Sequence, residues 1–227
     1  MTYLSAVIPT WCEVAMVERA VRAAHAVADE VLVADAASPD GTAAAARRAG
    51  ARVLQAPRGR GAQLHAGALA ARGDALLFLH ADARVPPEAR DAIERALADP
   101  RVVGGNFLLR FDPPGRAART LAALNDLRRL WLGIYYGDSA IFVRRAVYER
   151  IGGFSPMPIL EDYELVRRLE RAGPTAYVRD VVVTASARRF EGALLPTLAT
   201  WTALQLLYSL GVSAECLARF YADVRRP

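Results

Sequence analysis

The sequence has 227 residues and a mass of 24.6 kDa, which fits one ordinary domain or two halves that share a core. Hydrophobic residues make up 53% of the chain and charged residues 23%, which excludes a disordered or collagen-like protein. All 29 basic residues are arginine, so the net charge of +5 is reached without lysine. The lack of lysine excludes Schiff-base chemistry and a P-loop of the Gly-Lys-Ser/Thr type.

The cysteines and the two ends of the chain bear on the cell compartment. Cys12 and Cys216 are too few for a disulfide framework, which favours a reducing, cytoplasmic location. Residues 1–6 lack the basic start of a signal peptide. Residues 192–214 carry no charge and are long enough to span a bilayer, but polar residues, a proline and a glycine dilute them. We therefore expect a packed helix there, with peripheral contact to the inner membrane face or a dimer contact as open alternatives.

The first hundred residues alternate apolar runs with amphipathic stretches. Strands are predicted over 4–8, 31–34, 52–54 and 75–79, and helices over 14–28, 42–50, 61–72 and 86–98. Four strand-then-helix units of this length predict a parallel sheet with helices on both faces. Ligands bind such sheets at the carboxyl ends of the strands, where Thr10, Glu13, Asp35, Ser38, His80 and Asp82 gather.

The second half is less regular. Strands are predicted over 102–112, 139–143, 175–178 and 181–184, and helices over 116–132, over 161–172 and twice near the C-terminus. No repeat, linker or domain boundary stands out. We therefore predict a single domain with parts at about 1–103, 104–190 and 191–227.

Two acidic motifs could carry chemistry, although each has a structural interpretation. Asp82 in His80-Ala81-Asp82 follows an apolar strand, where a carboxylate can hold a divalent cation or can cap a helix. Glu161-Asp162 precedes a helix, where the dipole favours acids, but one carboxylate there could also take a proton from a hydroxyl.

A third candidate is the Arg58-Gly59-Arg60-Gly61 segment. It opens a helix and offers backbone N–H groups and guanidinium donors to an anion. It lacks the third glycine of a dinucleotide-binding fingerprint.

The order of these segments resembles family 2 glycosyltransferases of the GT-A fold. The resemblance covers residues 4–172. The matching segments, in chain order, are 7–10 with Glu13, 35–42, Arg60, 66–68, 78–82, 152–154 and 161–162. It is closest to a subgroup with a His-Ala-Asp motif that is associated with radical-SAM, selenium and arsenosugar genes. Residues 136–138, 142–145 and 187–190 carry that second likeness.

The resemblance implies a role for each matching position. It implies a nucleotide-binding half at 1–103, an acceptor and catalytic half at 104–190, and C-terminal helices. The nucleotide would be bound by Pro9, Thr10, Glu13, Asp35, Arg60 and His80. Asp82, together with His80 in place of the usual first acid, would hold Mg²⁺ or Mn²⁺, and Asp162 would be the catalytic base. Lesser contacts to phosphates or acceptor would come from Gly137, Asp138, Glu161, Arg188 and Arg189.

The implied reaction is an inverting transfer of a sugar from a nucleoside-diphosphate sugar, expected to be a UDP-sugar, to an acceptor hydroxyl. The resemblance also implies a bacterial, cytoplasmic enzyme, and the residues do not identify its acceptor. A nucleotidyltransferase is the rival enzyme, but residues 9–13 lack its glycine-rich loop and the chain lacks its lysine. A non-catalytic sugar-nucleotide-binding protein stays open because His80 replaces an acid. A nucleic-acid-binding module is disfavoured because the arginines are spread along the chain without a binding motif.

Overall fold

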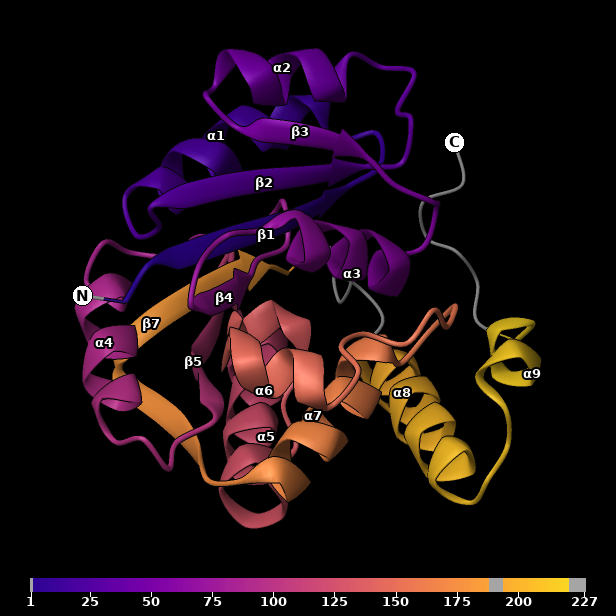
Figure 1. The fold of residues 1–227 in the computed structure, drawn as a ribbon. Helices are drawn as coiled ribbons and strands as arrows, with labels where there is room; N and C mark the ends of the chain where they lie inside the picture. Colours follow the sequence, from indigo (N-terminus) through magenta and orange to yellow (C-terminus); the bar gives the residue numbers. More distant parts are fainter. Residues whose placement is uncertain (1, 188–193, 221–227) are drawn as a thin grey trace.

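One seven-stranded sheet organises the chain, in the strand order β3-β2-β1-β4-β6-β5-β7 (Figure 1). The computed structural model describes residues 2–187 and 194–220. The strands are β1 (Leu4–Thr10), β2 (Glu30–Asp35), β3 (Arg52–Gln55), β4 (Ala75–Phe78), β5 (Gly104–Asp112), β6 (Ile141–Arg144) and β7 (Thr175–Ser186). β1 to β4 are parallel, as predicted, and β6 runs antiparallel to both of its neighbours. The prediction of a mostly parallel α/β fold is confirmed.

Helices cover both faces of the sheet. They are α1 (Val14–His25), α2 (Thr42–Arg48), α3 (Arg60–Ala70), α4 (Ala89–Ala98), α5 (Arg116–Leu132), α6 (Arg145–Arg150), α7 (Glu161–Ala172), α8 (Leu194–Ser209) and α9 (Ala214–Ala218). A short 3₁₀ turn, η1 (Gly137–Ser139), precedes β6. The predicted bounds of α5 and α7 match the structure, whereas α6 was not predicted. No helix among the described residues is both long enough and apolar enough to cross a bilayer.

The alternation of side chains along the central strands divides the core into two layers. Alternate residues of β1 such as Ala6 and Ile8 face a cluster formed with α1, α2 and α4, whereas Val7 faces a cluster formed with α3, α6 and α7. Gly67 of α3 packs so closely on Val7 that a side chain there would clash with it. A third cluster joins β5 and β7 to α5 and α8.

β7 corrects one prediction. Residues 175–178 and 181–184 belong to one continuous strand rather than to two. The strand pairs with β5 throughout, but its register shifts where Phe107 pairs with Val178 and Leu108 pairs with Val182. Arg179 and Asp180, which resemble a turn in the sequence, lie in this bulge at the exposed edge of the sheet.

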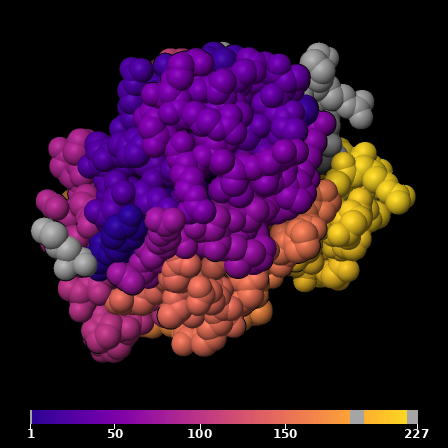
Figure 2. All heavy atoms as spheres, turned by 45° about the horizontal axis from the view of Figure 1, so that its top comes forward, coloured from indigo at the N-terminus to yellow at the C-terminus, as the bar shows by residue number. Residues whose placement is uncertain are grey.

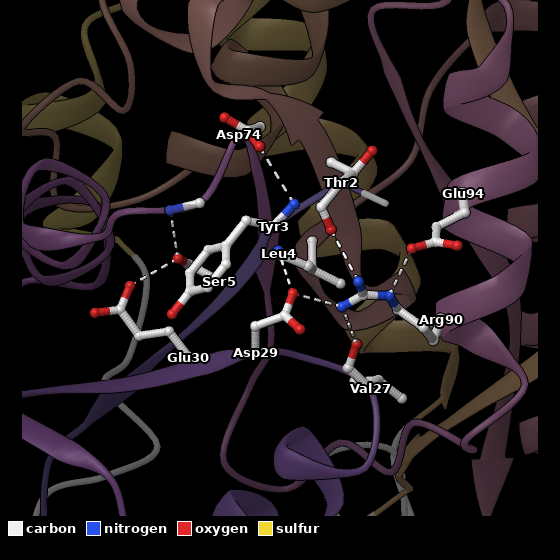
Figure 3. A network of polar contacts seen from close by, with 11 residues as sticks. Thr2, Tyr3, Leu4, Ser5, Val27, Asp29, Glu30, Asp74, Arg90 and Glu94 are labelled. Atoms are coloured by element: carbon white, nitrogen blue, oxygen red, sulfur yellow. Dashed lines mark hydrogen bonds and ion pairs between the residues drawn. The ribbon is translucent and has the colours of Figure 1, made fainter.

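A polar network surrounds the amino end of β1 (Figure 3). It lies at the opposite end of the strand from Thr10, where the predicted ligand-binding residues follow β1. The Leu4 N–H donates to the Asp29 carboxylate at 2.7 Å, and the Arg90 guanidinium donates to the same oxygen at 2.7 Å and to the Thr2 carbonyl at 2.8 Å. Burial would raise the pKa of Asp29, but these hydrogen bonds outweigh it and lower the pKa below its usual value. The network anchors β1 to α4.

We expect Asp29→Asn to lower the free energy of unfolding at pH 7 by about 1 kcal/mol, because hydrogen bonds to a charged group are lost at a half-exposed site. Since the folded-state pKa lies below the unfolded one, the wild-type advantage is present above the unfolded value of about 3.9 and fades as the pH falls through the folded pKa. Urea unfolding of both proteins between pH 3 and pH 7 measures this. A difference that does not change with pH would contradict the assignment.

Candidate active site

The carboxyl ends of β1 and β2 are tied together by buried polar side chains. The Thr10 hydroxyl donates to Asp35 Oδ1 at 2.9 Å, and the Ser38 hydroxyl donates to the same oxygen at 2.7 Å. Gln63 Nε2 of α3 donates to the carbonyls of Thr10 and Ala34 at 2.7 and 2.8 Å. Gln63 is 5% exposed and was not predicted, since a single glutamine in a helix gives no sequence signal. This arrangement sets a rigid floor where the two strands end.

The loop after β1 rests on this floor. The Cys12 N–H donates to the Ser38 hydroxyl at 3.0 Å, and the Glu13 N–H donates to the Thr42 hydroxyl at 2.9 Å. Trp11, a further residue that sequence reasoning missed, lies under the guanidinium of Arg58, 4.3 Å from the ring centre. Trp11 therefore presents an aromatic surface at the strand ends.

His80 lies beside the η1 turn. Its Nδ1 is 2.8 Å from Asp138 Oδ1, a hydrogen bond that places a proton on Nδ1. Its Nε2 faces Gly137, where a Cβ would lie 2.6 Å from that nitrogen. Only glycine fits this position without displacing the imidazole. Asp82, two residues further on, is half-buried.

Asp162 approaches the same turn from the start of α7. Its Oδ2 accepts the N–H of Gly137 at 2.9 Å, and its Oδ1 accepts the N–H of Tyr163 at 2.8 Å. The side chain is 10% exposed. The carboxylate is thus held in one orientation by two backbone donors, at a helix N-terminus that favours negative charge.

Arg60, the first residue of α3, pairs with both acids. Its Nε donates to the Glu161 carboxylate, which is 2% exposed, and its Nη2 lies 4.0 Å from Asp162 Oδ2. Burial alone would lower the pKa of Arg60, but the charges of Glu161 and Asp162 raise it above its usual value. Arg60 is therefore a permanent cation that is already balanced by carboxylates.

Several of these groups line a cavity of about 420 Å³ at the strand ends, whereas Thr10, Asp35, His80 and Asp82 are not among its lining residues. Its charged lining residues are Arg58, Arg60, Asp138, Glu161 and Asp162. Further parts of its wall come from Trp11, β5, α5, the loop before α7, α8 and α9. In Figure 1, β1 to β3 run toward the side of the molecule that carries α8 and α9.

The backbone around the cavity carries unusual conformations. Among the described residues, the non-glycine residues with positive φ are Cys12, Ala37, Ala140 and Leu160, at 54° to 63°. Cys12 and Ala37 follow β1 and β2, whereas Ala140 and Leu160 directly precede β6 and α7. Each residue therefore adjoins a segment of the candidate site. Such conformations cost about 1–3 kcal/mol each and concentrate at functional sites.

The structure brings together most of the residues singled out in the sequence. Arg60, His80, Gly137, Asp138, Glu161 and Asp162 form one contact network, while Pro9, Thr10, Glu13 and Asp35 lie at the adjoining strand ends. Arg188 and Arg189 lie outside the described residues. Within the described ranges, no three His, Cys, Asp or Glu side chains converge on one point.

Solved structures share this fold. A mannosyltransferase from Pyrobaculum calidifontis, solved with GDP-Man and Mn²⁺, is 25% identical, with a TM-score of 0.63 over 81% of this chain and 56% of that one. Glucosyl-3-phosphoglycerate synthase from Mycobacterium tuberculosis, solved with Mn²⁺, UDP-Glc and phosphoglyceric acid, is 22% identical, with a TM-score of 0.60 over 82% of this chain and 70% of that one. Mannosyl-3-phosphoglycerate synthase from Rubrobacter xylanophilus is 23% identical, with a TM-score of 0.58 over 82% and 66%.

The chain spans little more than half of the length of the mannosyltransferase. A comparison with curated proteins found no match to this chain. The model of a protein family, described as glycosyl transferase family 2, matches residues 5–157, more than half of the chain. Two of these solved proteins carry a nucleotide sugar, and all three share the mostly parallel α/β fold predicted from the sequence. The chain belongs to glycosyl transferase family 2.

Proposed function

We propose that the protein is an inverting glycosyltransferase that moves a sugar from a nucleoside-diphosphate sugar, expected to be a UDP-sugar, to an acceptor hydroxyl. The observation that carries the proposal is the Asp162 carboxylate. It lines the cavity, it is oriented by the N–H groups of Gly137 and Tyr163, and it has the Arg60 cation 4.0 Å away. A base for an acceptor hydroxyl needs such a carboxylate oxygen held in a fixed orientation.

The nucleotide would lie at the floor formed by β1 and β2. Thr10 and Asp35 end these strands. Asp35 already accepts three hydrogen bonds from Thr10 and Ser38, so it would fix the position of these residues as well as contact the nucleotide directly. Trp11 adds an aromatic face suited to a base. Arg60 is occupied by two acids, so we propose that its main role is to position Asp162 and Glu161 rather than to bind phosphate.

A divalent cation fits the donor set at the end of β4. Mg²⁺ and Mn²⁺ prefer carboxylate oxygens and are commonly bound by one or two side chains together with substrate phosphates, so a cluster of three protein ligands is not required. We propose that Asp82 holds the cation. Both nitrogens of His80 face protein groups, Asp138 and Gly137. His80 would therefore hold the neighbouring turn in place rather than bind the cation. A bound cation would neutralise charge on the leaving pyrophosphate.

The chemical step uses Asp162. Its carboxylate takes the proton of the acceptor hydroxyl while the hydroxyl oxygen forms a bond to the anomeric carbon. The bond from that carbon to the phosphate oxygen breaks on the opposite face, and its electron pair leaves with the nucleoside diphosphate. Attack from the opposite face inverts the anomeric centre.

The donor is tested by thermal shift with UDP-, GDP- and dTDP-sugars, with and without Mn²⁺. At a hundredfold excess over Kd, binding adds about 2.7 kcal/mol, which raises the Tm of a chain of this length by about 5 °C or more. We expect a shift that needs Mn²⁺ and that Asp82→Ala reduces, with Asp91→Ala at an exposed position of α4 as the matched control. Stabilisation by nucleoside triphosphates alone, with turnover to a nucleotide sugar, would instead support the nucleotidyltransferase.

Two finer assignments stay predictions. The subgroup with the His-Ala-Asp motif rests on the resemblance of His80-Ala81-Asp82 and of the segments quoted with it. Membrane or dimer contact through 192–214 is favoured by exposed leucines such as Leu206 on α8 and Leu210 directly after it. Co-sedimentation with anionic vesicles would support the first contact, a doubled mass in light scattering would support the second, and a monomer that ignores vesicles would contradict both.

A further inference from the structure

The cavity lining contains two chemically different sets of side chains. Beside the charged residues, it includes the apolar side chains of Leu109 and Phe111 on β5, Leu160 before α7, and Trp201 and Leu204 on α8. Leu109, Phe111 and Leu204 are 4–7% exposed, so this wall is part of the packed structure. Asp162 lines the same cavity as these apolar side chains, from the first turn of α7.

The position of α8 is fixed against this cavity. Trp201 packs on the cluster of β5, β7 and α5, and the hydroxyl of Tyr136 donates to Gln205 Oε1 at 2.5 Å. Tyr136 directly precedes Gly137, whose N–H orients Asp162, so α8 is coupled to the proposed base. Burial raises the pKa of Tyr136 to about 12, which keeps its hydroxyl a neutral donor. Figure 2 shows α8 and α9 (yellow) projecting beside the orange segment that leads into α7.

The charged lining residues are unfavourable for an anionic acceptor. Among the described residues that line the cavity, the carboxylates of Asp138, Glu161 and Asp162 outnumber the cations Arg58 and Arg60. Arg60 is already paired with two of these acids, and Arg58 lies over Trp11. A phosphate or carboxylate placed beside Asp162 would meet like charge without an uncommitted guanidinium on the described walls.

We propose that the acceptor is an uncharged alcohol with an apolar body, whose body lies on the wall formed by Leu109, Phe111, Trp201 and Leu204 and whose hydroxyl reaches Asp162. This inference rests on the proposed transfer to a hydroxyl and adds the class of acceptor. It sets this chain apart from the structural relative that was solved with phosphoglyceric acid, an anionic ligand. Water excluded from the apolar wall supplies the affinity, and the single reactive hydroxyl supplies the orientation.

The test compares three probes with the donor identified by thermal shift: octyl β-D-glucoside below its micellar concentration, D-glucose and 3-phosphoglycerate. We expect octyl glucoside to accelerate release of the nucleoside diphosphate at least tenfold more than either other probe. Leu204→Ser should lower kcat/KM for octyl glucoside about tenfold, because it removes most of one buried leucine from the wall. The Kd of the donor should not change.

Leu207→Ser on the same helix is the matched control, because Leu207 is 41% exposed and does not line the cavity. A preference for 3-phosphoglycerate, or equal loss in Leu204→Ser and Leu207→Ser, would overturn the inference. Binding of octyl glucoside is also followed without donor, as a change in tryptophan fluorescence that Trp201→Phe reduces more than Trp11→Phe does. Binding without turnover by any donor would count against the proposed function alone, whereas turnover with glucose but no binding of octyl glucoside would count against the acceptor class alone.

Discussion

Asp162→Asn is expected to lower kcat for sugar transfer about a thousandfold while the Kd of the donor changes less than twofold. An amide cannot take the acceptor proton, and general-base catalysis contributes about 10²- to 10⁴-fold. The amide oxygen can replace only one of the two carboxylate oxygens that accept the N–H groups of Gly137 and Tyr163, so a loss of about 1 kcal/mol of stability accompanies the loss of the base. Release of nucleoside diphosphate measures turnover, and thermal shift measures donor binding.

The control is Asp91→Asn, which makes the same chemical change on the exposed face of α4 and should leave both quantities unchanged. Full turnover by Asp162→Asn would show that another group takes the proton. Loss of donor binding in the same variant would assign Asp162 to the donor subsite instead.

Arg60→Met is expected to lower the free energy of unfolding by about 3 kcal/mol, because it leaves the buried carboxylate of Glu161 without its cation. The double variant Arg60→Met/Glu161→Leu should regain most of this stability, since an apolar pair can replace a buried ion pair. It should remain inactive, because Asp162 also loses the charge 4.0 Å away. Chemical denaturation and turnover of both variants measure these effects.

Arg48→Met is the matched control for stability. Arg48 pairs with Glu18 at 3.1 Å, but its side chain is 65% exposed, so the expected change is below about 1 kcal/mol. Equal losses in Arg48→Met and Arg60→Met would contradict the claim that burial makes the Arg60 pair important. Recovery of transfer in the double variant would contradict the positioning role of Arg60.

The strands β1 to β4 and their helices could be predicted from the sequence because their signals are local. Apolar runs such as 75–79 end at polar residues, and Gly50 and Gly73 mark where helices and loops turn. The start of α7 was predictable for the same reason, since acids at 161–162 precede a helical pattern.

The rest of the site depends on tertiary contacts that leave no sequence pattern. Nothing in the sequence pairs Arg60 with Glu161, 101 residues away, or Tyr136 with Gln205. Ala37 and Leu160 adopt positive φ although alanine and leucine do not signal it, because the packed loops impose that conformation. The polar residues Arg179 and Asp180 made β7 look like two strands in the sequence. The strand is continuous because pairing with β5 accommodates both residues in a bulge.

The anomeric configuration of the product tests the central claim most directly. The purified chain, Mn²⁺, the donor found by thermal shift and octyl β-D-glucoside are incubated, and the new glycosidic linkage is assigned by proton NMR coupling constants. With an α-linked donor such as UDP-α-glucose, direct attack by a hydroxyl deprotonated by Asp162 predicts a β-linked product that is absent with Asp162→Asn. An α-linked product would contradict the inverting mechanism and the role of Asp162 as its base.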